Sequence, residues 1–332
     1  MEKVMERFKK PIAYAVWSTN DEIRFNSTSG GVFSEFASIV IANHGLVAGA
    51  QYNKENLVEH ALVDSRDGVE KLRQSKYLSS SIGNIYKMIK HCLKNGQTVA
   101  FCGSPCQVAG LYSFLGSDNN NLFTMDFICR GTNSPKAFKA WLSEIEDSEG
   151  QKINKVWFKY KEGGWKTSPR RTRVDFDNGD YRVFEGQYNS YMNGYLNSNL
   201  YIRPCCGNCC FKGAPRKSDV TFADFWGVDK SLDDDKGTSL LLINSKKGKE
   251  YFNKIKENVF FTEVSFESIY VGNPMYSKSV KISPKAHSFL LGLDSMTFSE
   301  AIKRFTPKKT IWRRLKIKAM NIIKRALQRN GK

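Results

Sequence analysis

The fold of this chain is constrained most by a regular alternation of short apolar segments with segments of helical periodicity. Apolar strands are predicted at residues 12–17, 45–51, 98–101, 122–128, 218–222 and 238–244. Helical spacing is found at residues 32–43, 82–93, 106–115 and 248–257. Alternating strands and helices form βαβ units, which place parallel strands in one sheet. We therefore expect an α/β fold with a mainly parallel or mixed sheet and flanking helices.

Residues 150–200 depart from this pattern. They are rich in aromatic residues, Gly and Asn, and apolar and charged residues alternate at residues 155–159. Such a segment predicts hairpins or long loops inserted over the sheet. The chain has 332 residues, which suits one large α/β domain. We expect this domain to cover residues 1–300, with the insertion at about 150–200.

Residues 301–332 differ again in composition. They contain twelve Lys or Arg and no acid, which is two thirds of the net charge of +18. Apolar residues recur at helical spacing from about residue 310, so the segment predicts a basic amphipathic helix. Such a helix binds an anionic membrane surface or packs on the body through its apolar stripe. Nucleic acid is a less favoured partner, because no nucleic-acid-binding motif accompanies the charge.

The cellular compartment follows from two further features of the sequence. No apolar segment approaches the ~20 residues that span a bilayer, and residues 1–17 lack the apolar core of a secretory signal. We expect a cytoplasmic protein, peripheral at the inner membrane face if the basic helix binds lipid. Thiols stay reduced in the cytoplasm, so clustered cysteines there predict metal or redox chemistry.

Eight cysteines are present, and four of them occupy six consecutive residues: Cys205, Cys206, Cys209 and Cys210. Cys106 and Cys129 each follow the carboxyl end of a predicted strand, and these ends share one edge of a parallel sheet. Together with a Cys-x-x-Cys pair, they provide four soft ligands for zinc or an iron–sulfur cluster. Single cysteines from two strand ends favour a cluster over a zinc ribbon, and unligated redox thiols are the third possibility. Cys92 and Cys102 are expected to be core residues.

Several motifs, in this order, carry a resemblance to a known family. They are STSGGVF at residues 27–33, SKY at 75–77, GSPCQVAGL at 103–111, DFICRG at 126–131, RPCCGNC at 203–209, SDVTFADFWG at 218–227 and KGTS at 236–239. With these motifs the chain resembles the coenzyme F420 hydrogenase/dehydrogenase beta-subunit family over about residues 12–260. That family also includes a plant reductase of the chlorophyll pathway.

The resemblance implies an oxidoreductase that holds FAD and a [4Fe-4S] cluster. It implies four cluster ligands: Cys106, Cys129, Cys206 and Cys209. It also implies that FAD lies near Ser29, Gly30, Gly31, Ser75, Lys76, Tyr77, Gly103, Ser104 and Asp224. The sequence has no Gly-x-Gly-x-x-Gly fingerprint, so a Rossmann-type FAD site is not expected. No catalytic residue is assigned.

Many members of that family carry an N-terminal ferredoxin segment with repeated cysteines. No cysteine precedes Cys92 here, so we expect a separate ferredoxin or reductase to donate electrons. Short members resemble proteins of surface-polysaccharide pathways, which is the expected setting of this chain. The alternative function is a non-catalytic, metal-stabilised binding protein of a polysaccharide assembly.

Overall fold

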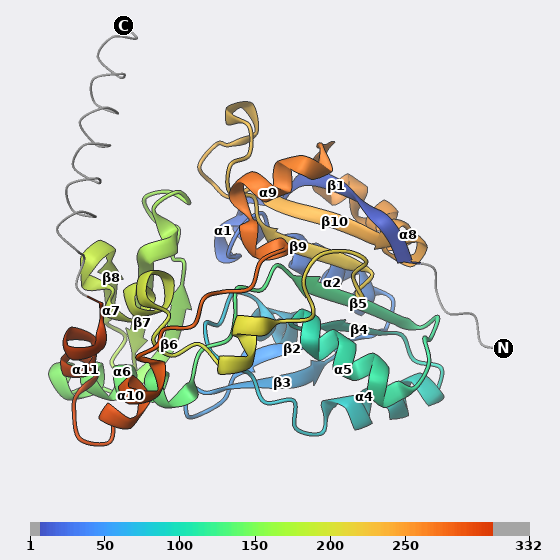
Figure 1. Ribbon diagram of the computed structural model, residues 1–332. Helices are drawn as coiled ribbons and strands as arrows, with labels where there is room; N and C mark the ends of the chain where they lie inside the picture. Colours follow the sequence, from blue (N-terminus) through green and yellow to red (C-terminus); the bar gives the residue numbers. More distant parts are fainter. Residues whose placement is uncertain (1–6, 308–332) are drawn as a thin grey trace, which may run out of the picture.

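The structure is a computed structural model, and it describes residues 7–307. Two sheets organise the described part of the chain (Figure 1). The larger has eight strands in the order β11-β1-β10-β9-β5-β4-β2-β3. Its strands are β1 (Arg7–Ser18), β2 (Leu46–Tyr52), β3 (Val58–Val63), β4 (Val99–Cys102), β5 (Leu122–Phe127), β9 (Val220–Asp224), β10 (Ser239–Ser245) and β11 (Val259–Glu263). The predicted strands are thus present, whereas β3 and β11 are additional.

The large sheet is mixed, as predicted. Strands β2, β4, β5 and β9 run parallel to one another. The outer strands β3, β10, β1 and β11 pair antiparallel with their neighbours. The carboxyl ends of the four parallel strands therefore meet at one edge of the sheet, which is the edge that open α/β folds use for ligands.

Helices cover both faces of this sheet. One face packs against α2 (Val32–Ala42), α3 (Arg66–Leu72) and α8 (Lys246–Ile255) through residues such as Phe36 and Phe252. The other face packs against α4 (Ile85–Lys94) and α5 (Pro105–Leu115) through Ile89 and Val108. The flanking α/β layers predicted from periodicity are confirmed by these contacts.

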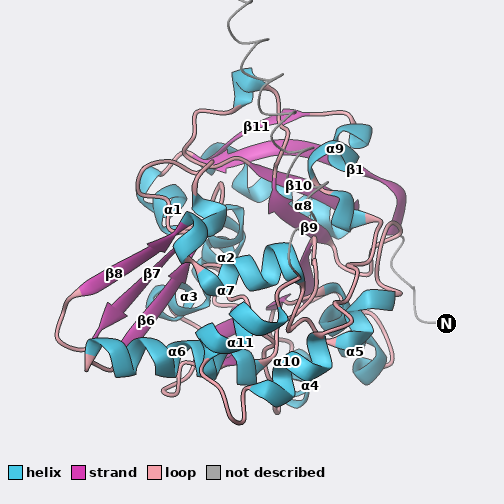
Figure 2. Ribbon diagram, turned by 60° about the vertical axis from the view of Figure 1, so that its left-hand side comes forward, coloured by secondary structure: helices cyan, strands magenta, loops and turns pink. Residues whose placement is uncertain are grey.

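The small sheet lies beside the large one (Figure 2). It contains β6 (Ile153–Phe158), β7 (Arg171–Phe176) and β8 (Tyr181–Glu185), all antiparallel. It shares an aromatic core with α6 (Pro135–Glu149), α7 (Ser190–Asn193), α10 (Ala286–Gly292) and α11 (Phe298–Phe305). Residues 153–185 thus form hairpins. They pack on helices that precede and follow them in the sequence.

The remaining helices are short: α1 (Asp21–Asn26) follows β1, and α9 (Ile269–Gly272) follows β11. Among residues 7–307, no helix is long and apolar enough to cross a bilayer. The basic helix predicted within residues 301–332 falls almost entirely outside the described residues; only the end of α11 overlaps its first positions.

Candidate active site

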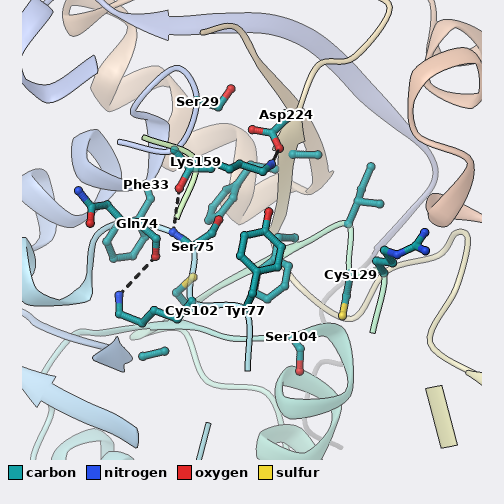
Figure 3. Close-up of a pocket in the computed structure, with 18 of the residues that line it drawn as sticks. Ser29, Phe33, Gln74, Ser75, Tyr77, Cys102, Ser104, Cys129, Lys159 and Asp224 are labelled. Carbon is teal, nitrogen blue, oxygen red and sulfur yellow. Dashed lines mark hydrogen bonds and ion pairs between the residues drawn. The ribbon is translucent and has the colours of Figure 1, made fainter. Parts of the chain in front are cut away.

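The carboxyl edge of the parallel strands opens into a cavity of about 530 Å³ (Figure 3). Its walls come from the loops after β4, β5 and β9 and from the segments at residues 27–33 and 72–80. On the side of the small sheet, the cavity is lined by Lys159, Met192 and Tyr195. The volume lies within the range of about 300–1,000 Å³ that is usual for ligand pockets.

Eight of the nine residues predicted to lie near FAD line this cavity. They are Ser29, Gly31, Ser75, Lys76, Tyr77, Gly103, Ser104 and Asp224. Gly30 is the exception, because it packs against strands β1 and β10. A Cβ atom there would lie 2.5 Å from the carbonyl oxygen of Val16 and 3.0 Å from the amide nitrogen of Ser239. Gly30 thus allows close strand packing, not close approach of a ligand.

Helix α2 begins at the cavity wall. Its N-cap residue Gly31 has a φ of +87°, a conformation that glycine adopts easily, and no side chain caps the helix. Gly31, Val32 and Phe33 all line the cavity. An uncapped helix N-terminus offers free amide donors and a positive dipole end, which favour a bound anion.

The charged lining of the cavity is mainly basic. Arg73, Lys76, Arg130 and Lys159 line it, and Asp224 is the single Asp or Glu of residues 7–307 that does so. The Nε atoms of Arg73 and Arg130 have no hydrogen-bond partner among the described residues. This charge balance suits a ligand with negative charge.

Lys76 is held by its own loop. Its ammonium donates to the backbone carbonyls of Leu72, Arg73 and Gln74, at 3.2, 2.7 and 3.3 Å. Burial lowers the pKa of Lys76 to about 7. Because an ammonium has three donors, Lys76 braces the loop and has no donor left for a phosphate in this arrangement.

His60, on strand β3, is a lining residue that the sequence does not identify. Its Nε2 lies 3.2 Å from the carbonyl oxygen of Cys102, which can only accept, so Nε2 carries the proton. Nδ1 is buried without a hydrogen-bond partner. Burial lowers the pKa of His60 to about 4, so the ring is neutral near pH 7. Among residues 7–307 no group donates to Nδ1, so it is an unsatisfied acceptor of a residue in the cavity wall.

Lys159 is a second lining residue that the sequence does not identify. Its ammonium pairs with the carboxylate of Asp224, and Tyr77 lies beside it, with the ammonium 5.8 Å from the ring centre (Figure 3). Burial lowers the pKa of Lys159, but Asp224 and Tyr77 outweigh burial, so the pKa is raised. Burial also raises the pKa of Tyr77. Lys159 is therefore a permanent cation in the cavity wall.

A second, smaller cavity of about 90 Å³ adjoins the first. Five cysteines line it: Cys106, Cys129, Cys205, Cys206 and Cys209. The four predicted ligands are thus brought together from α5, the loop after β5 and the Cys-x-x-Cys turn. Cys205, which the spacing leaves without a role, is exposed at the same cavity.

Polar groups fix the sulfur-bearing segments. The Oγ of Ser104 lies 3.1 Å from the Sγ of Cys106, and the amide of Cys209 donates to the Oγ of Ser279 at 3.0 Å. Lys212 donates to the carbonyls of Cys129 and Met275, at 2.5 and 2.9 Å. These bonds hold the walls of the cavity without occupying the sulfurs of Cys129 and Cys209.

The thiols surround a space and do not converge on one point. Within residues 7–307, no three side chains of His, Cys, Asp or Glu are arranged to hold a metal ion. A single zinc needs four ligands at about 2.3 Å from one centre. An iron–sulfur cluster instead fills a volume between four cysteines. The all-thiol donor set and the cavity that its members line have the chemistry that an iron–sulfur cluster requires.

The other cysteines are placed elsewhere. Cys92 lies on α4 and is buried in the core, as predicted. Cys102 packs partly against the core and also lines the larger cavity, and burial raises its pKa to about 12. Cys210 is exposed and lines neither cavity.

Comparisons with known proteins support the predicted family and show a similar fold. A family model that describes the C terminus of the coenzyme F420 hydrogenase/dehydrogenase beta subunit matches residues 96–268, just over half of the chain. A chain of the xenon-derivatised F420-reducing [NiFe] hydrogenase complex from Methanosarcina barkeri has a similar fold. Its TM-score is 0.51 at 16% sequence identity, over 91% of this chain and 92% of that chain. No curated protein matches the sequence.

Proposed function

This chain belongs to the coenzyme F420 hydrogenase/dehydrogenase beta-subunit family, a family of redox enzymes, and on that premise we propose that it is an oxidoreductase dependent on FAD and a [4Fe-4S] cluster. The observation that carries the proposal is the junction of the two cavities. Seven residues line both: Ser80, Ser104, Gln107, Cys129, Arg130, Gly131 and Thr132. A bound flavin can exchange electrons in pairs with a substrate and singly with a cluster, so adjoining sites would connect a two-electron substrate with a one-electron donor.

In this proposal the larger cavity binds FAD. The uncapped start of α2 and the basic lining supply the positive potential that a pyrophosphate requires. The Nδ1 of His60 accepts a hydrogen bond from a ligand amine, imide or hydroxyl. Lys159 keeps a positive charge in the wall, and Asp224 holds its position. Together these residues bind and orient the cofactor.

The smaller cavity holds the cluster through Cys106, Cys129, Cys206 and Cys209. All four side chains line it, and they come from three different segments, so ligation depends on the folded edge of the sheet. Cys205 lies at the same cavity but is not assigned as a ligand.

We propose that the electron donor is a separate acidic carrier protein, such as a ferredoxin, or a reductase. Three segments around the cysteine cavity, residues 129–135, 203–218 and 274–288, contain eight Lys or Arg and no acid. Residues 7–307 together have a net charge of +9, so most of the excess positive charge lies in these segments. Five of the eight basic residues are exposed: Arg203, Lys217, Lys278, Lys281 and Lys285. A basic face beside the cysteines attracts an acidic partner.

Three further parts of the proposal rest on the sequence. The protein is proposed to act in the cytoplasm, in surface-polysaccharide biosynthesis, and to touch the anionic inner membrane face through its basic C-terminal helix. Flotation with anionic vesicles tests the last part. Full-length protein is expected to float, and a chain ending at Pro307, which retains α11, is expected to remain at the bottom.

Anaerobic purification tests the central proposal. The expected result is a brown protein with flavin absorbance, one flavin, and about four irons per chain. Colourless protein with stoichiometric zinc would instead support the metal-stabilised binding protein. Protein that contains iron but no flavin would contradict only the assignment of FAD to the larger cavity.

A further inference from the structure

Arg216 is a buried cation in the wall of the cysteine cavity. Its side chain is only 3% exposed, and it lines the cavity together with Cys129 and Cys209. Its Nη1 donates to the carbonyl of Phe211 at 3.3 Å. The Nε and Nη2 atoms have no hydrogen-bond partner among the described residues.

The neighbouring polar groups do not satisfy these two nitrogens. The Oδ2 of Asp126 lies 3.6 Å from Nη1, which is an ion-pair distance and too long for a hydrogen bond. The ring of Tyr276 lies beneath the guanidinium, with its centre 4.9 Å from the Cζ of Arg216. Within residues 7–307, Asp126 Oδ2 and Tyr276 Oη also lack hydrogen-bond partners. Buried unsatisfied donors are costly and rare in native proteins, so they point to a missing acceptor.

Lys212 is a second cation at the cysteine cavity, and its hydrogen bonds differ from those of Arg216. Lys212 also lines the cavity, but its ammonium donates to two backbone carbonyls. Arg216 is held from one side by Phe211 and Asp126, and the planar guanidinium keeps its remaining N–H groups in a fixed orientation. An acceptor-rich anion between the cysteines would satisfy them.

We propose that Arg216 donates hydrogen bonds to the group held by the cysteine cavity and raises its reduction potential. This inference rests on the proposed function. The reduced form of a cluster carries one more negative charge than the oxidised form, so a buried cation and its hydrogen bonds stabilise the reduced form more. Arg216 is therefore a positioning residue that sets the potential, and the four cysteines provide the covalent ligation.

The test is an anaerobic spectroelectrochemical titration of the purified full-length protein. At the wild-type midpoint potential, Arg216→Gln is expected to lower the ratio of reduced to oxidised cluster about tenfold, a shift of about −59 mV for one electron. Arg216→Lys keeps the charge but loses the planar fork, so a smaller shift in the same direction is expected. Lys217→Gln removes an equal charge from the exposed neighbour, and its ratio is expected to change less than twofold.

Iron content is measured for every variant. The inference would be overturned if Arg216→Gln kept its full iron content and its midpoint potential shifted no more than that of Lys217→Gln. If Arg216→Gln loses its iron, the midpoint potential of Arg216→Lys is the test. A wild-type potential in Arg216→Lys would overturn the role of the guanidinium. Wild-type protein without iron would instead contradict the proposed function, so the two failures are distinguishable.

Discussion

The ammonium of Lys159 pairs with the carboxylate of Asp224 in the wall of the larger cavity. Lys159 directly follows β6 of the small sheet, and Asp224 ends β9 of the large sheet. The two side chains are 8% and 12% exposed. This ion pair therefore connects the two sheets in the wall of the larger cavity.

Breaking the pair is expected to destabilise the fold. Lys159→Met leaves the Asp224 carboxylate buried without its partner, and the free energy of unfolding is expected to fall by about 3 kcal/mol. The double variant Lys159→Met/Asp224→Asn removes both charges and is expected to lose less than the sum of the single variants. Urea denaturation of the wild type, Lys159→Met, Asp224→Asn and the double variant measures this coupling.

The matched control is the pair of Lys10 and Glu267, whose side chains are each 65% exposed. Water screens such a pair, so Lys10→Met is expected to leave the urea midpoint nearly unchanged. Equal losses from the buried and the exposed pair would contradict the structural role of Lys159.

Substitutions in the cysteine cavity separate ligands from neighbours. Cys206→Ser is expected to remove most of the bound iron, because one of four ligands is lost. Cys205→Ser and Cys92→Ser are expected to keep it, since the first residue lies at the rim and the second in the core. Iron and sulfide analysis after anaerobic purification measures the difference. Iron retained in Cys206→Ser and lost in Cys205→Ser would reverse the assignment.

His60 predicts a specific pH dependence of stability. Its pKa is about 4 in the folded protein, because burial disfavours the charged ring, and about 6.5 in an unfolded chain. Between these values the unfolded state binds more protons, so stability falls as pH falls from 6.5 to 4. The loss attributable to His60 is about 3 kcal/mol.

His60→Phe is the matched variant, because it keeps an aromatic ring against Phe101 but cannot titrate. Its unfolding free energy is expected to depend less on pH between 6.5 and 4 than that of the wild type. Parallel curves for the two proteins across this window would show that His60 does not carry the effect.

Charge reversal tests the basic face beside the cysteines. The double variant Lys278→Glu/Lys281→Glu is expected to slow reduction by an acidic ferredoxin at least tenfold at low salt, because electrostatic attraction governs association. Lys249→Glu on α8, which lies at the opposite edge of the sheet, is expected to have little effect. Stopped-flow kinetics with increasing salt measures both, and the difference is expected to disappear at about 1 M salt. If the double variant is slowed by the same factor in its reduction by dithionite, the substitutions have damaged the cluster.

The sequence predicts the large sheet well because most of its central strands are short apolar runs. The predicted segments at 45–51 and 238–244 agree with β2 (Leu46–Tyr52) and β10 (Ser239–Ser245) within one residue at each end. Helix α6 is not identified from the sequence, although its signals are present. Pro135 follows Ser134 at its start, Gly150 ends it, and its buried residues share one face.

What the sequence alone determined is local: the alternation of strands and helices, the spacing of Cys206 and Cys209, and the placement of Cys106 and Cys129 after strand ends. Tertiary structure decided which residues share a cavity. Lys159 and Asp224 are 65 positions apart. Arg216 lines the same cavity as the cysteines, and two of its nitrogens lack a partner among the described residues. Periodicity records which face of an element is buried, whereas contacts between distant segments depend on how the sheets pack. For this reason the cysteines that share the smaller cavity could be found in the sequence, and the charged residues around them could not.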